Sequence, residues 1–588
     1  MKPLRILLQF FLFLIVTVAC SPQPTAISTA IPTITPTSTT PPTPTETPLP
    51  PTATATAIPT IPPTLTPGAV GSVTNLQPGW WNDAVFYEIF VRSFKDSSGD
   101  GIGDFNGITE KLDYLNDGNP NTTTDLGVTA LWLMPIMASG SYHGYDVNNY
   151  YTVNPQYGSK LDFLRLVDEA HKRGIRIIID LVLNHTGLDN SWFRLSDRGD
   201  PKYRDWYIWS KTKPSYTGPW GEQVWYAGKD GYYYAVFWSG MPDLNLANPV
   251  VTKEVDNFVS FWLNSMNVDG FRLDAIPYFL EDNGVLANSK GTHAWLQAFY
   301  QYNKSIDPSI YTVGEAWMRT DVASAYVSNH EVDNVFEFDL ASAFLRSAAG
   351  PLATSASDQL KTVLANYPAG QYGVFLTNHD QPRTMTVLRG DVKKAKLAAV
   401  MMLTSPGVPY IYYGEEIGMT GAKPDENLRR PMQWTGNGPT AGFTSGTPWE
   451  PVANDYRTAN VAVESADPNS LLSLYRRLIH LRNQYPALRT GQTIVLNSGS
   501  PLVYAILRYD EKDAFLILLN VDDSRKVKAD SYGIKTDSWP IPANFKISSV
   551  MGLQNPAKPQ MNAAGGLEDY RPYPTLPPQS YTILHFAP

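Results

Sequence analysis

Short apolar segments recur along the chain from residue 86 to residue 413, and helix-like patterns separate most of them. There are eight, at 86–91, 128–134, 175–183, 270–275, 311–314, 335–338, 373–376 and 410–413. After the second segment, Leu161, Leu164, Val167 and Ala170 have helical spacing, and Gly174 follows as a helix end. Near-continuous apolar strands joined by helices are typical of a parallel sheet. The sequence therefore predicts an α/β fold with a (β/α)8 barrel, and a doubly wound sheet is the alternative.

The amino terminus has the pattern of an export signal. Lys2 and Arg5 precede an apolar run at 6–19, which is too short for a comfortable transmembrane helix. Thr17-Val-Ala-Cys20 resembles a bacterial lipoprotein box with Cys20 as the lipid acceptor, and an ordinary cleaved signal peptide is the alternative. We expect export, with the protein either secreted or anchored at the cell surface, and membrane contact only through that anchor. Because Cys20 is the only cysteine, the folded part has no disulfide.

The remaining composition divides the 588 residues into further parts. Residues 21–79 form a linker, which is almost entirely Pro, Thr, Ala, Ser and Ile up to residue 67 and cannot bury a core. We interpret it as a stalk, or as an unanchored flexible leader. The barrel is predicted over 80–487. The short strands at 502–507 and 515–519 predict a β-sandwich over 488–588.

Charge and aromatic content limit the class of ligand. The net charge of −9 argues against binding to nucleic acid, which needs a basic surface. Aromatic residues make up 12% of the chain, with 33 Tyr and 15 Trp. Flat amphipathic rings of this kind suit stacking on sugars, and they equally suit the edges of a large core.

Polar side chains cluster where the predicted strands end. They are Asp180, Asn184 and His185 after the third strand, Arg272 and Asp274 on the fourth, Glu315 after the fifth, and His379 and Asp380 after the seventh. In a (β/α)8 barrel the carboxyl ends of the strands carry the catalytic residues. Arg272 and Asp274 are two apart, so they point to the same side of a strand, as a structural ion pair or as part of a site.

Three carboxylates without a histidine cluster of the metal-binding type suit cleavage of a glycosidic bond. Asp274, kept ionised by Arg272, suits the nucleophile. Glu315 lies beside Trp317 without an adjacent basic residue, and an apolar setting would raise its pKa, as a general acid requires. Asp380 would stabilise the positively charged transition state. The residues alone leave retention and inversion of configuration open.

Four segments together resemble the main sequence regions of the α-amylase family of glycoside hydrolases. They are Asp180-Leu-Val-Leu-Asn-His185, Gly270-Phe-Arg-Leu-Asp274, Gly314-Glu-Ala-Trp317 and Phe375-Leu-Thr-Asn-His-Asp380. The resemblance implies a retaining mechanism with Asp274 as nucleophile, Glu315 as general acid/base and Asp380 as stabiliser. It implies that His185, Arg272 and His379 contact the sugar and that Asp180 is a support. It also implies a small inserted domain, placed here at 186–245.

Two further segments bear on the branch of the family. Met241-Pro-Asp-Leu-Asn245 is similar to a group intermediate between oligo-1,6-glucosidases and neopullulanases. In exo-acting members an Asp commonly lies three residues before the Tyr of Gly144-Tyr-Asp146, where this chain has Tyr142. The resemblance thus implies an endo-acting α-amylase that cleaves α-1,4 bonds of starch, glycogen and maltooligosaccharides, with His143 and Tyr145 on the sugar. We expect a monomer.

Other residues favour relatives with different substrates. Arg430-Pro-Met-Gln-Trp434 resembles the glucosidase and trehalose synthase side of the family. Pro277 and Tyr278 stand where many amylases have a Lys-His pair that contacts the reducing side of the glucan. An α-glucosidase, a cyclomaltodextrinase-like or a trehalose synthase-like enzyme is therefore the alternative, and a non-catalytic surface glucan-binding protein is a third possibility.

A short acidic loop follows the first strand. Oxygen atoms of Asp96, Ser98, Asp100 and Asp104 and the Ile102 carbonyl alternate with glycines, a spacing that suits a hard cation. A solvated acidic turn is the alternative. The same loop type in oligo-1,6-glucosidases binds calcium, with Asn in place of Ser98. We predict a structural Ca2+ there.

Overall fold

The computed structural model describes residues 76–587 apart from 283, 541–544 and 564. The chain divides into two units, 1–65 and 66–588, and only the second contains described residues. The predicted signal peptide, Cys20 and the linker up to residue 75 lie outside the described residues.

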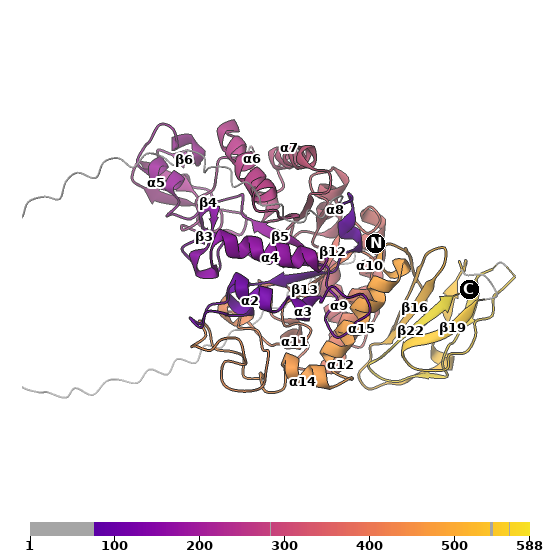
Figure 1. The fold of residues 1–588 in the computed structure, drawn as a ribbon. Coiled ribbons are helices and arrows are strands. Elements are labelled where there is room, and N and C mark those ends of the chain that lie inside the picture. Colours follow the sequence, from indigo (N-terminus) through magenta and orange to yellow (C-terminus); the bar gives the residue numbers. More distant parts are fainter. Residues whose placement is uncertain (1–75, 283, 541–544, 564, 588) are drawn as a thin grey trace, which may run out of the picture. The chain divides into compact units, whose positions relative to one another are not determined.

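A parallel sheet of eight strands forms the centre of the molecule, in the order β11-β10-β9-β5-β2-β1-β13-β12 (Figure 1). The strands are β1 (Phe86–Ile89), β2 (Ala130–Leu133), β5 (Arg176–Leu181), β9 (Gly270–Leu273), β10 (Tyr311–Gly314), β11 (Asn334–Val335), β12 (Gly373–Val374) and β13 (Val408–Tyr412). A parallel bridge between Phe336 and Gly373 joins the two outer strands. The sheet therefore closes into a barrel, which confirms the (β/α)8 prediction and excludes the doubly wound alternative.

Alternate residues of the strands face two different cores. Inside the barrel, Phe86, Trp132, Ile178 and Tyr410 belong to one apolar cluster. The residues between them face the surrounding helices and belong to the main core, as Leu131 does. Because both faces are covered, most residues of the strands are apolar, and charged exceptions such as Asp180 and Arg272 lie toward the carboxyl ends.

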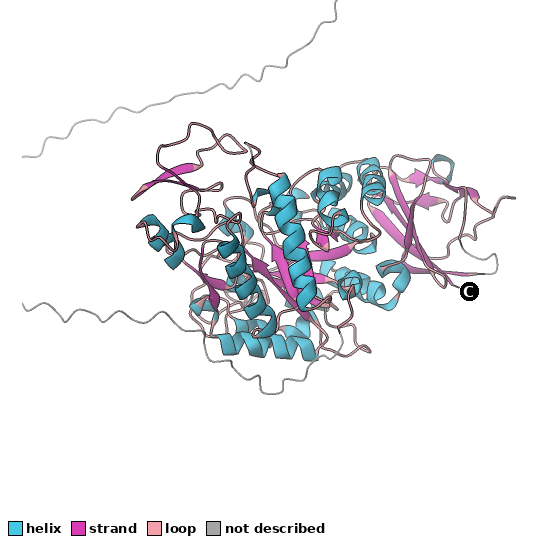
Figure 2. Cartoon of the chain, turned by 90° about the horizontal axis from the view of Figure 1, so that it is seen from above, coloured by secondary structure: helices cyan, strands magenta, loops and turns pink. Residues whose placement is uncertain are grey.

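Helices follow the barrel strands and flank them (Figure 2). They are α2 (Phe105–Glu110) and α3 (Leu112–Leu115), α4 (Lys160–Lys172), α6 (Pro249–Asn264), α7 (Lys290–Ile306), α8 (Thr320–Ser328), α9 (Phe338–Ala349) and α10 (Thr354–Asn366), α12 (Val392–Thr404), and α15 (Leu471–Gln484). None of the helices in the described part of the chain is both long and apolar enough to cross a membrane.

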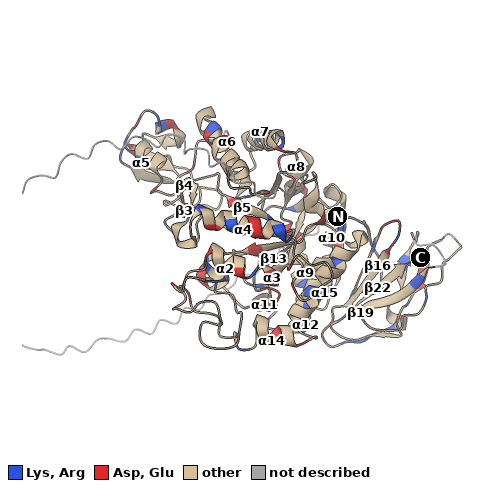
Figure 3. Ribbon diagram, in the orientation of Figure 1, with Lys and Arg blue, Asp and Glu red and all other residues tan. Residues whose placement is uncertain are grey.

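The α4 helix illustrates how sequence sets the bounds of an element. Ser159 caps its amino terminus in a capping box with Asp162, and Gly174 with a φ of 75° follows its end. Its buried face includes Phe163 and Leu166, whereas Leu161, which the spacing placed on that face, is 68% exposed. The opposite face carries acidic and basic residues side by side (Figure 3).

Between β5 and α6 the chain forms a small separate structure. It contains α5 (Ser191–Asp197) and an antiparallel sheet of β6 (Trp209–Ser210), β8 (Gly231–Tyr234) and β7 (Trp225–Gly228). Val224, Trp225, Tyr234 and Val236 make a core of their own, against which Tyr278 of the barrel packs. Its aromatic residues are thus partly core, as Trp225 is, but Trp220 is 59% exposed.

The carboxy-terminal part is antiparallel. A five-stranded sheet in the order β14-β15-β16-β22-β19 packs on two two-stranded ribbons, β17-β21 and β18-β20. The sheet strands are β14 (Gln492–Val495), β15 (Val503–Tyr509), β16 (Ala514–Asn520), β19 (Lys546–Gly552) and β22 (Ser580–Ala587), and the ribbon strands are β17 (Val527–Lys528), β18 (Ile534–Thr536), β20 (Leu567–Tyr570) and β21 (Thr575–Leu576). In β16, Phe515 and Ile517 belong to the main core that the barrel strands share with their helices, whereas Leu516 and Leu518 belong to the core of the carboxy-terminal domain. The predicted sandwich is confirmed.

Candidate active site

Arg272 lies at the centre of the carboxylates at the strand ends. It is fully buried on β9, directly across from Asp180 of β5 in the strand register. Its Nη1 donates to Asp180 Oδ1 at 2.8 Å and to Asp274 Oδ1 at 2.7 Å, and its Nη2 donates to Glu315 Oε2 at 2.6 Å. One guanidinium therefore positions three carboxyl groups.

The contact to Glu315 corrects one step of the sequence reasoning. Glu315 has no basic residue beside it in the sequence, from which an apolar setting was inferred, but Arg272 reaches it from the adjacent strand. The pKa of Glu315 is nevertheless raised, to about 7, because its burial and the charges of Asp274 and Asp380 outweigh Arg272. The carboxyl group can thus hold a proton near neutral pH, as a general acid must.

Asp380 has the opposite charge state. Burial raises its pKa, but His379 and Arg429 outweigh burial and lower the pKa to about 2. Arg429 Nη2 lies 2.7 Å from Asp380 Oδ1, and His379 Nε2 lies 3.3 Å from Oδ2. Sequence reasoning missed Arg429, although it directly precedes the Arg430-Pro-Met-Gln-Trp434 motif.

Tyr145 and His379 form a flat aromatic surface beside these carboxylates. Their rings stack with centroids 5.6 Å apart at 14°, and Tyr145 Oη lies 2.6 Å from His379 Nε2. On its other side, His379 Nδ1 lies 2.6 Å from Glu88 Oε1 of β1. Burial lowers the pKa of His379, but Asp380 and Glu88 raise it overall, which favours the imidazolium. Glu88 was also missed, because nothing in its own segment marks it.

These side chains line a cleft of about 630 Å3. Six of the residues predicted to form the site line it, namely His143, Tyr145, His185, Asp274, Glu315 and Asp380. Arg272 and His379 lie directly behind them. Neither ring nitrogen of the buried His185 has a hydrogen-bond partner in the described part of the chain. Burial lowers the pKa of His185 and outweighs Asp274 and the Tyr145 backbone, which raise it, so a neutral imidazole faces the cleft and can bind a ligand hydroxyl.

The loop at 96–104 has its carboxylates engaged within the protein. Asp96 Oδ1 accepts the Ser98 and Gly99 N–H groups at 2.8 and 2.7 Å, and Oδ2 accepts that of Gly101 at 2.8 Å. Asp104 caps α2 through Gly107 N at 2.7 Å. Among the described residues, no group of three or more His, Cys, Asp or Glu side chains is arranged to hold a metal ion. Calcium binding at this loop stays a prediction.

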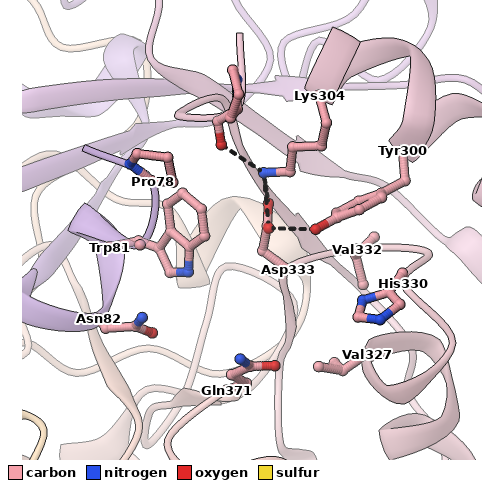
Figure 4. Close-up of a pocket in the computed structure, with 12 residues that line it drawn as sticks. Pro78, Trp81, Asn82, Tyr300, Lys304, Val327, His330, Val332, Asp333 and Gln371 are labelled. Carbon is pink, nitrogen blue, oxygen red and sulfur yellow. Dashed lines mark hydrogen bonds and ion pairs between the residues drawn. The ribbon is translucent and has the colours of Figure 1, made fainter. Parts of the chain in front are cut away.

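A second hollow, of about 400 Å3, lies at the other end of the barrel (Figure 4). Its charged groups satisfy each other, since Lys304 Nζ binds Asp333 at 2.9 Å and Tyr300 donates to the same carboxylate at 3.3 Å. Trp81 is covered by Lys304 on one side and stacks on Tyr311. This hollow offers few free groups to a ligand.

The model of the α-amylase catalytic domain matches residues 88–491. The chain belongs to the α-amylase family. It is a glycoside hydrolase of that family, as the sequence motifs predicted, and the matched range runs from within β1 to beyond α15.

Individual relatives differ in their substrates. α-Amylase 3 of Dictyoglomus thermophilum is 40% identical over 442 residues, which are 74% of this chain and 84% of that protein. The trehalose-6-phosphate hydrolase of Bacillus subtilis is 32% identical over 535 residues, 79% of this chain and 93% of that protein. The crystal structure of the α-amylase from H. orenii is 39% identical with a TM-score of 0.74, covering 85% of this chain and 99% of that one. Family membership therefore leaves the specific substrate open.

Proposed function

We propose that the protein is an α-amylase, which hydrolyses internal α-1,4 bonds of starch, glycogen and maltooligosaccharides with retention of configuration. The observation that carries this proposal is the shared guanidinium of Arg272, which holds Asp274 and Glu315 at once. A single planar group keeps the two carboxyl groups close together, as a double displacement with a separation of about 5–5.5 Å requires.

The proposed roles follow from the charge states. Asp274 attacks the anomeric carbon while Glu315, protonated near neutral pH, gives its proton to the leaving oxygen. Asp380, which stays ionised, stabilises the positive charge that develops on the sugar. Glu315 then takes a proton from water, which attacks the anomeric carbon and releases Asp274.

The non-reducing side of the cleft supports endo action. Tyr142, at the position where exo-acting relatives commonly carry an Asp, stacks on Trp449 with centroids 5.3 Å apart at 26°. Its ring is held by that contact and is not part of the cleft lining. No carboxylate at this position therefore grips a terminal sugar.

One observation favours an α-glucosidase instead. Asp425 and Arg429 both line the cleft, and their side chains lie 3.5 Å apart. A carboxylate and a guanidinium there could bind the hydroxyls of a terminal glucose.

The time course of products distinguishes these functions. Purified protein would be incubated with starch and with maltose, and the products resolved over time, with Glu315→Gln as the inactive control. Mixed oligosaccharides appearing first support the α-amylase. Glucose alone or trehalose appearing first contradicts it and supports the alternatives. Binding of starch without turnover would instead indicate a surface glucan-binding protein.

We further propose that the enzyme is exported and held at the cell surface by a lipid on Cys20. The basic and apolar pattern of residues 2–19 supports export. In a bacterial host, the wild-type chain should take up radiolabelled palmitate and sediment with membranes, whereas Cys20→Ala should do neither. Equal labelling of both chains would contradict lipidation at Cys20.

A further inference from the structure

Three tryptophans of the described chain are more than half exposed. Trp220 is 59% exposed, Trp317 56% and Trp238 51%. Exposed large aromatic surface is costly in water and commonly marks a place where a ligand or partner binds. Trp220 and Trp317 line the same cleft as the carboxylates, whereas Trp238 does not.

Trp220 is held in place by other aromatic side chains. Its ring centroid lies 5.1 Å from that of Tyr278 and 5.9 Å from that of Phe237. Phe237 and Tyr278 contact each other at 5.7 Å and 78°. The Trp220 backbone N–H also donates to Glu222 Oε2 at 2.9 Å. A ring supported from behind and open in front is preorganised for stacking, since little side-chain freedom remains to be lost.

The position of Trp220, Phe237 and Tyr278 relative to Glu315 indicates on which side of the cleaved glycosidic bond these rings contact the substrate. The Ala275 N–H donates to Glu315 Oε2 at 3.2 Å, and the short 3-10 helix Ile276–Tyr278 follows directly, so Tyr278 lies three residues from a direct contact with the proposed acid. Arg429, by contrast, pairs with Asp380 at 2.7 Å and with Asp425 at 3.5 Å. Because the acid protonates the leaving oxygen, the sugar beside Tyr278 and Trp220 is the one that leaves.

We propose that Trp220, supported by Phe237 and Tyr278, is the stacking surface for the leaving-group side of the α-glucan. This inference rests on the proposed function. The pyranose ring presents an apolar face of C–H groups, which suits stacking on an indole, while the carboxylates and histidines of the same cleft can bind its hydroxyls. Stacking on Trp220 also explains how this chain, which has Pro277 and Tyr278 in place of a Lys-His pair, binds the reducing side of its substrate.

The test compares a substrate that has sugars on the leaving side of the cleaved bond with one that has none. Maltoheptaose has sugars on the leaving side, whereas α-maltotriosyl fluoride releases only fluoride. Trp220→Ala should lower kcat/KM for maltoheptaose about tenfold and leave that for the fluoride within about twofold. Trp220→Tyr should restore most of the loss, because it keeps a stacking ring. Trp238→Ala, an exposed tryptophan of the same segment outside the cleft, should leave both values within about twofold.

Three outcomes would overturn the proposal. One is an unchanged kcat/KM for maltoheptaose in Trp220→Ala. Another is an equal loss on both substrates, which would indicate a general disturbance of the cleft. If the wild-type protein cleaves neither substrate, the proposed function fails and this inference falls with it.

Discussion

Arg429 forms an ion pair with Asp380 at 2.7 Å, although 49 residues separate the two in the chain. Arg429 is 3% exposed, and its Nε also donates to the His379 carbonyl at 3.1 Å. The guanidinium thus positions both the carboxylate and the strand end that carries it. With His379, it is what keeps the pKa of Asp380 at about 2 in a site where burial alone would raise it.

Replacing Arg429 with Met should therefore raise the pKa of Asp380. Loss of an adjacent cation typically raises a carboxyl pKa by about one or more. A larger fraction of Asp380 is then protonated at low pH, so the acid limb of kcat/KM should move upward, while Arg429→Lys should keep most of its position. The pH profile on maltoheptaose measures this. An acid limb that stays in place in Arg429→Met would contradict the role.

The raised pKa of Glu315 predicts the basic limb of the pH dependence of kcat/KM. Since its pKa is about 7, the acid form is present below that pH and is lost as the pH rises through it, so kcat/KM should fall above about pH 7. Glu315→Gln should lower kcat on maltoheptaose about 10²–10⁴-fold and remove this limb. The first step with α-maltotriosyl fluoride should suffer less, because fluoride leaves without a proton. A basic limb that persists in Glu315→Gln would exclude the assignment.

The contrast between these groups shows what could be predicted from the sequence. The barrel and the meeting of Asp274, Glu315 and Asp380 follow from strand periodicity and from the rule that parallel strand ends converge. The partners of those carboxylates could not be predicted, because Glu88 and Arg429 come from a distant strand and a distant loop. No local sequence pattern indicates that these residues lie beside the site. Nothing in the sequence distinguishes Trp220 from the other tryptophans, since the exposure of its ring depends on the packing of its loop.

The β16 strand shows that part of the fold, too, could not be predicted from the sequence. Its unbroken apolar run was interpreted as one of the alternating strands of a sandwich. In the structure both faces of β16 are covered, one by the main core and one by the core of its own domain. Such a run is compatible with either arrangement until its neighbours are known.

Calcium binding should show as a change in thermal stability. An ion that binds only the folded state raises Tm with its concentration. We expect a higher Tm in excess Ca2+ than in EDTA, and Asp100→Ala should remove the difference while leaving the Tm in EDTA nearly unchanged. Equal Tm values for the wild type in Ca2+ and EDTA would contradict the prediction.

Arg482 should be important for stability rather than activity. It is fully buried on α15, and its Nη atoms donate to the carbonyl oxygens of Leu403, Ser405 and Gly407 at 3.1, 2.8 and 2.6 Å. These carbonyls belong to the last turn of α12 and to the loop after it, where the helix dipole favours a cation. Burial and the nearby Arg508 lower its pKa to about 9, so it stays charged at neutral pH.

Arg482→Met should lower the free energy of unfolding by about 3 kcal/mol or more, because it leaves buried carbonyls without donors at about 1–3 kcal/mol each. Arg477→Met on the exposed side of the same helix is the matched control and should change it by less than about 0.5 kcal/mol. Calorimetry of both variants, with kcat/KM measured well below Tm, tests the claim. Equal melting of the two variants would show that the carbonyl oxygens find other donors, such as water, when the guanidinium is removed.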